Sequence, residues 1–324
     1  AYNLENLNYK DYRMKKLLVT FIVFTSMAYG LVDMDELNAN HCAHTINQAH
    51  TIVTPPLFFE DSALQLKTTN SKTHYEFRHN SQSHELRGNT GKIRDFVVTQ
   101  NYIWTVGTAG LIKHDLNGDF LSFYGHKSWQ GSRHNLPRGV YYHKSNNHLY
   151  IASGGAGLLT FDLNTQQFTS KDMLNVQNDN GHLSAAVAVV GDASDRLYIA
   201  MTGNSERGFN GVLSYSLNQK KILNKAEYNK RRAGVVFPYA SIYLENNKVI
   251  LNNGGWIHSL KLDQVESKST VKPRWHAIAY YLNDVRKFVM MAGDLLFEEA
   301  EVIGCGRYFQ NNGQVDYKAF KARI

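Results

Sequence analysis

The sequence predicts an all-β fold, a single-domain β-propeller, because short strand-like segments recur along it at nearly regular intervals. The recurring segments are residues 103–106 (IWTV), 149–152 (LYIA), 197–200 (LYIA), 249–252 (VILN) and 288–291 (FVMM). Successive copies start 46, 48, 52 and 39 residues apart, which is the spacing of propeller blades rather than of helical repeats. Val, Ile, Tyr and Phe dominate these runs, and no long apolar stripe with a helical period interrupts them.

A second recurring strand follows the first after a glycine-rich turn. Its copies are residues 110–117 (GLIKHDLN), 157–164 (GLLTFDLN), 211–218 (GVLSYSLN) and 256–263 (WIHSLKLD), of which the last has no leading glycine. The first strand of each blade is predicted at 95–99, 139–143, 185–190, 240–244 and 277–282, and short polar turns link several of them to the next strand. Strands around residues 64–66 and 75–77 would supply a further sheet.

The N-terminal residues have the features of a secretory signal. Met14 is followed by Lys15 and Lys16, an apolar run over residues 17–24 and small residues up to Gly30. The run is too short to span a membrane. We therefore expect residues 1–13 to be an upstream translated segment, residues 14–30 to be a signal peptide, and residues 31–324 to be the propeller. The predicted location is periplasmic or secreted, with no transmembrane segment after the signal is removed.

The length left for the propeller favours six blades. About 294 residues remain of the 324, which gives each of six blades about 49 residues. Five or seven blades are alternatives, because the two ends of the chain match the repeat poorly. One way to close the ring would be for an N-terminal strand to join the last blade, which would leave no exposed edge.

Two cysteines, Cys42 and Cys305, lie near the two ends of the predicted ring. In an exported protein we expect them to form a disulfide that ties these ends together. The alternative is a pair of thiols that do not meet. His41 and His44 flank Cys42 and could complete an open zinc or copper site, but the thiolate is better used in the disulfide, and we expect no metal site.

The formal charge limits the classes of partner. It is +7 for the whole chain and falls to +5 without residues 1–30, because four basic residues and two acidic ones are removed. Such an excess could favour an anionic partner. The longest basic run is the triplet of residues 230–232, so we do not expect nucleic-acid binding.

The predicted site is the rim of the central channel. There the beginnings of the innermost strands would meet the glycine-rich turns at 107–110, 153–157, 202–211 and 252–255. The candidate ligand-binding residues are Arg94, Arg138, His182, Arg207, Tyr239, Asn253 and His276. Guanidinium groups, amides and free backbone N–H groups in the turns would suit a carboxylate or a phosphate. The alternative is that the glycines only permit positive φ and that the arginines pair with Asp95 or neighbouring strands.

The turn at 202–211 is longer than its counterparts. Long loops on a rigid scaffold often bind ligands, and Arg207 and Phe209 would then be its contact residues. A solvated excursion without function is equally compatible with the sequence.

The Gly-Leu-x-x-x-Asp strand that follows an aromatic and apolar strand resembles quinoprotein-like and two-component-regulator-type propeller repeats, over residues 91–263. The resemblance implies a propeller far more strongly than an activity. The glycine missing at Trp256 and the lack of a repeated tryptophan motif argue against a quinone, so we expect no cofactor.

We therefore favour a binding module for an unidentified protein or a small anionic ligand over an enzyme. A metal-assisted hydrolase or lactonase on the same face and an envelope assembly scaffold are the alternatives. The rim contains few carboxylates besides Asp95, which disfavours the hydrolase.

Overall fold

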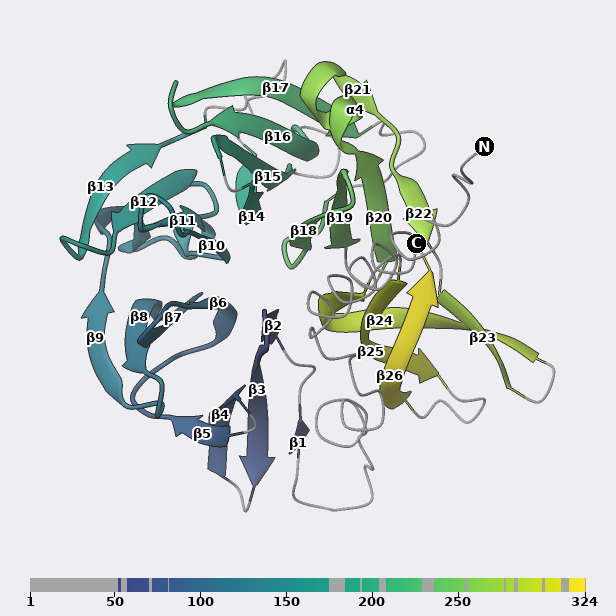
Figure 1. The fold of residues 1–324 in the computed structure, drawn as a ribbon, viewed down its shortest axis with the longest axis horizontal. Coiled ribbons are helices and arrows are strands. Elements are labelled where there is room, and N and C mark those ends of the chain that lie inside the picture. Colours follow the sequence, from purple (N-terminus) through teal and green to yellow (C-terminus); the bar gives the residue numbers. More distant parts are fainter. Residues whose placement is uncertain are drawn as a thin grey trace, which may run out of the picture. The chain divides into compact units, whose positions relative to one another are not determined.

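The computed structural model shows six β-sheets arranged around a centre (Figure 1). It describes residues 52–53, 57–69, 72–80, 82–174, 184–192, 194–203, 208–228, 236–253, 256–276, 278–282, 285–298, 301–309 and 315–323. The described residues all belong to one compact unit, residues 35–324. The six-bladed arrangement predicted from the repeat is confirmed, since the described residues form six sheets rather than five or seven.

The first three sheets are each built from consecutive strands. The first contains β1 (Ile52–Val53), β2 (Leu57–Phe59), β3 (Ser62–Thr69), β4 (Lys72–His79) and β5 (Gln82–Leu86). The second contains β6 (Ile93–Val98), β7 (Tyr102–Gly107), β8 (Gly110–Asp115) and β9 (Phe120–Tyr124). The third contains β10 (Gly139–His143), β11 (His148–Ala152), β12 (Leu158–Asp162) and β13 (Gln167–Asp172).

The other three sheets complete the ring. The fourth contains β14 (Ala185–Gly191), β15 (Arg196–Thr202), β16 (Gly211–Ser216), β17 (Lys221–Tyr228) and β21 (Thr270–Val271), which joins it in parallel with β17. The fifth contains β18 (Ser241–Glu245), β19 (Lys248–Asn253), β20 (Trp256–Lys261) and β22 (Arg274–His276). The sixth contains β23 (Ile278–Leu282), β24 (Val285–Glu298), β25 (Glu301–Phe309) and β26 (Val315–Arg323).

Few of the described residues are helical. The short helices are η2 (Lys127–Trp129), η3 (Arg133–Asn135) and α4 (Leu262–Ser267). None of the helices in the described part of the chain is long and apolar enough to span a membrane.

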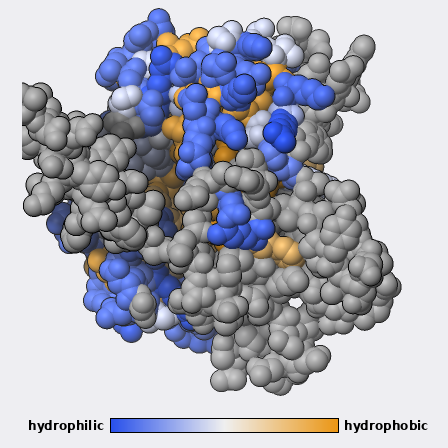
Figure 2. All heavy atoms as spheres, turned by 45° about the vertical axis from the view of Figure 1, so that its right-hand side comes forward, coloured by the Kyte–Doolittle hydropathy of each residue, from blue (hydrophilic) through white to orange (hydrophobic). Residues whose placement is uncertain are grey.

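The five repeated segments all lie in the second strand of a sheet, on β7, β11, β15, β19 and β24. The side chains of the segments on β7, β11, β15 and β19 are buried between successive sheets. Hydrophobic clusters among the described residues join the first sheet to the second through Phe77 and Phe96, and the second to the third through Trp104 and Phe161. Hydrophilic residues cover most of the described surface in Figure 2, and hydrophobic residues show in the gaps between them. Because the second strands are buried along nearly their whole length between neighbouring sheets, each recurring apolar segment marks one blade of the ring.

The last sheet differs from the predicted repeat. β23 pairs with only the first half of β24, and the register of β24 against β25 shifts between Ala292 and Leu295. β24 also contacts β2 of the first sheet, and Leu295, Leu296 and Phe297 at its end line the same cavity as β2. The described strands of the last sheet, β23 to β26, all come from the C-terminal part of the chain. The expected N-terminal strand in the last blade is therefore not found among the described residues.

The predicted disulfide is not tested by the structure. Cys305 lies on β25 with 1% of its surface exposed, whereas Cys42 lies outside the described residues, together with His41 and His44. The disulfide therefore stays a prediction.

Candidate functional site

A cavity of about 810 Å³ runs through the centre of the ring. Its walls come from the innermost strand of each sheet, namely β2, β6, β10, β14, β18 and the end of β24. This volume lies within the range of about 300–1,000 Å³ that is usual for small-molecule sites. We call this cavity the channel.

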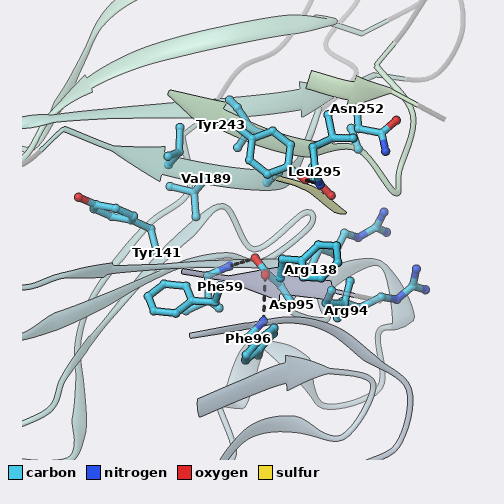
Figure 3. Close-up of a pocket in the computed structure, with 18 of the residues that line it drawn as sticks. Phe59, Arg94, Asp95, Phe96, Arg138, Tyr141, Val189, Tyr243, Asn252 and Leu295 are labelled. Atoms are coloured by element: carbon cyan, nitrogen blue, oxygen red, sulfur yellow. Dashed lines mark hydrogen bonds between the residues drawn. The ribbon is translucent and has the colours of Figure 1, made fainter. Parts of the chain in front are cut away.

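Two arginines lie at one end of the channel. Arg94 is the second residue of β6, and Arg138 directly precedes β10. Both side chains extend to the same side, the side of Asn252, whereas the Tyr141 hydroxyl points to the other side (Figure 3). Lys92 and Tyr239 also line the cavity. Lys92, Arg94, Arg138 and Tyr239 are called the arginine mouth below.

The arginine mouth has an excess of positive charge. Among the residues that the structure describes, no carboxylate forms an ion pair with Arg94 or Arg138. Burial lowers the pKa of Arg138, the charge of Arg94 lowers it further, and Tyr239 acts in the opposite direction. Desolvation of one cation beside another disfavours the charged form, and a bound anion would relieve both effects.

Asp95 forms no ion pair with Arg94 or Arg138, contrary to the alternative considered from the sequence. One carboxylate oxygen accepts from the Phe96 backbone N–H and the other from that of Val140, both at 2.8 Å. The second bond joins the second sheet to the third. Asp95 lies inward of the two guanidinium groups (Figure 3), so it serves the wall of the channel.

The turn that carries Tyr239 is fixed from two sides. Asn253 Oδ1 accepts from the Phe237 backbone N–H at 2.7 Å, and the Arg138 guanidinium donates to the Pro238 carbonyl at 3.4 Å, which is long for a hydrogen bond. Phe237 and Tyr239 are 42% and 70% exposed. Two accessible aromatic rings therefore stand on the turn that borders the arginine mouth.

The other predicted site residues are placed differently. Asn253 is 1% exposed and supports the turn, while its neighbour Asn252 lines the channel. His276 lies on β22, the strand of its sheet farthest from the channel, where its Nε2 is 2.8 Å from Ser259 Oγ. His182 and Arg207 lie outside the described residues. Only Arg94, Arg138 and Tyr239 of the predicted set are seen together at the channel.

The glycine-rich turn at 153–157 does not offer free backbone donors. Every backbone N–H from residue 153 to residue 157 donates to a backbone carbonyl, and the Thr108 N–H donates to the Lys92 carbonyl. Gly154 and Gly157 have φ of +51° and +82°. The glycines thus provide positive φ and close packing, as the alternative reading of the sequence held.

Phe209 is not an exposed contact residue. Only 5% of its surface is accessible, and it packs in the cluster between the third and fourth sheets with Ala152 and Leu158. The expectation that this ring reaches a ligand from the long turn is wrong, because the ring fills the core instead.

Sequence reasoning missed Lys92 and Asn252. Lys92 precedes the predicted first strand, two residues before Arg94, and that spacing on one extended segment could have placed both on the same side.

The carboxylates that line the channel are Asp95 and Glu60, and Glu60 pairs with Lys144 at 2.7 Å. The described residues contain no group of three or more metal-ligating side chains.

Comparison with known proteins supports the fold alone. No protein-family model and no curated protein sequence matches the chain. Among solved structures, it is similar to the extracellular domain of the putative one-component system BT4673 from B. thetaiotaomicron, with a TM-score of 0.50 and 10% identity. That match covers 89% of this chain and 35% of the other, so the chain spans about a third of the protein it resembles.

Proposed function

We propose that this protein is an exported binding module that captures a small anion at the arginine mouth of its propeller. The observation that carries the proposal is the pair Arg94 and Arg138, which extend to the same side and have no ion-pair partner among the described carboxylates. Guanidinium groups in such a setting form strong, charge-assisted hydrogen bonds with carboxylates and phosphates.

Export is proposed from the secretory pattern of residues 14–30. The similar solved structure is described as an extracellular domain, which fits the same location. A binding role also accords with the channel, whose carboxylates are occupied by structural bonds.

The test is anion binding by the mature protein and two charge-matched double variants. Acetate and inorganic phosphate are titrated by calorimetry into the wild type, Arg94→Ala/Arg138→Ala and Lys221→Ala/Lys225→Ala. The two lysines are exposed on β17, away from the channel, so both variants lose the same charge. We expect the arginine variant to lose at least tenfold in affinity and the lysine variant to bind like the wild type.

Equal losses in the two variants would mean that net charge alone attracts the anion. No binding to the wild type, or unchanged affinity in the arginine variant, would contradict the proposal. Thermal unfolding of all three proteins controls for damage to the fold.

A further inference from the structure

The channel behind the arginine mouth has an apolar wall. Each of the six sheets contributes an apolar residue to this wall. These residues are Phe59, Val97, Val140, Val189, Ile242 and Leu295. Figure 3 shows Phe59, Val189, Tyr243 and Leu295 around the same space, which lies inward of the guanidinium groups of Arg94 and Arg138. A ligand that enters past the arginines therefore meets hydrocarbon.

Three polar side chains of this wall, those of Tyr243, Tyr141 and Asp95, are already hydrogen-bonded. The Tyr243 hydroxyl accepts from the Leu295 backbone N–H at 2.9 Å, and the Tyr141 hydroxyl donates to the Asp192 carbonyl at 3.1 Å. Both oxygens of Asp95 accept from backbone N–H groups. These bonds leave the wall better suited to an apolar chain than to a polar one, because a polar ligand would gain few partners for the water it gives up.

The negative charge of Asp95 fixes the direction of the ligand. It lies inward of the guanidinium groups, so an anionic head is attracted at the mouth and repelled farther inside (Figure 3). An uncharged tail is not repelled. The exposed rings of Phe237 and Tyr239 stand beside the entrance and extend the apolar surface outward.

From this arrangement we propose that the preferred ligand is an amphipathic carboxylate, with its carboxylate held by Arg94 and Arg138 and its apolar tail in the channel. The proposal rests on the anion-binding function above and names the chemical class of its ligand. The cavity of about 810 Å³ has room for a tail of several carbons.

The test is a chain-length series of carboxylates, acetate, butyrate, hexanoate and octanoate, titrated into the mature protein. Each buried methylene should improve affinity about fourfold, so octanoate should bind at least tenfold more tightly than butyrate. Octylammonium and 1-octanol carry the same tail without the anion, and we expect each to bind at least tenfold more weakly than octanoate. Octyl phosphate tests whether the head can be a phosphate.

Two sets of variants locate the ligand. Arg94→Ala/Arg138→Ala should lose octanoate binding, whereas Lys221→Ala/Lys225→Ala should retain it. Val189→Thr changes the polarity of the wall at nearly constant shape and should weaken octanoate severalfold without altering acetate, while Val189→Ile should preserve the preference for long chains.

The outcomes separate this inference from the proposed function. If acetate and phosphate bind through the arginines but affinity does not rise with chain length, the anion site stands and the amphipathic ligand is refuted. If long chains bind regardless of charge or of the arginines, the tail binds nonspecifically and the inference is also refuted. If no anion binds, both proposals fail.

Discussion

His258 should make the propeller less stable in mild acid. It lies on β20 with 1% of its surface exposed, and its ring is 5.8 Å from that of Tyr228, between centroids. Burial lowers the pKa of His258 to about 4, and the charge of His276 acts in the same direction. An unfolded histidine titrates near 6.5.

The sign follows from proton binding. Between pH 6.5 and pH 4 the unfolded chain binds a proton at this position and the folded protein does not, so the free energy of unfolding falls as the pH is lowered. The gap between the two pKa values corresponds to roughly 3 kcal/mol, fully lost only below about pH 4. Within this range the slope reaches about 1.4 kcal/mol per pH unit.

The assay is urea unfolding at pH 7.0, 5.5 and 4.5 for the wild type and His258→Gln. The variant will be less stable at neutral pH, but its stability should decline less steeply in acid, since the titrating group is gone. Burial also lowers the pKa of His114, His126 and His276, so the variant should retain part of the slope. Identical pH profiles for the wild type and His258→Gln would refute the reasoning.

Two further predictions concern the links between sheets. Asp95→Ala should lower the free energy of unfolding by about 1–3 kcal/mol, because the buried Val140 N–H loses its acceptor, and Asp95→Asn should recover part of it; urea midpoints that put the alanine variant at or above the asparagine variant would contradict this. Gly154→Ala should cost on the order of 3 kcal/mol or more, since its Cβ would lie 1.9 Å from the His134 carbonyl oxygen. Gly131→Ala has φ of +72° but no described atom within 4 Å and should cost only about 1 kcal/mol, so equal losses of thermal stability in the two glycine variants would show that close packing is not the cause.

The ring could be predicted from the sequence because its repeat carries the packing itself. Leu149 and Leu197 occupy the same position in two second strands, and both are fully buried. The predicted first strands at 139–143 and 185–190 agree with β10 and β14 within a residue. Both faces of these strands are buried between neighbouring sheets, so the recurring apolar run itself marks each blade.

The last sheet could not be predicted in the same way. Residues 293–294 are Gly and Asp, a pair that is typical of turns, yet they lie within β24 where its register shifts. The same strand contacts β2 and so closes the ring. A local pattern gives no information about this closure, because the partner strand is more than 200 residues away.

The site was predicted where a residue adjoins the start of an innermost strand and not elsewhere. Arg94 and Arg138 satisfied that condition. The prediction for Asn253 was wrong because successive side chains of a strand point to opposite faces. At the end of β19, Asn252 lines the channel and Asn253 is buried. The prediction for His276 was wrong because this residue ends β22, the outermost strand of its sheet. It precedes the first strand of the next sheet in the sequence, but it does not lie at the channel.

The arginine mouth is difficult to explain by stability alone. Arg138 is half-buried, its pKa is lowered by burial and by Arg94, and its hydrogen bond to the Pro238 carbonyl is long. A desolvated cation without a counter-ion destabilises a fold, whereas Glu60 and Lys144 show that this chain can pair charges at the channel. Such a local cost is expected at a binding site, where the ligand supplies the missing charge. The same reasoning applies to the apolar wall of the channel. Packing between the sheets explains the side of the wall that faces the core, and a ligand with an apolar tail explains the side that faces the channel.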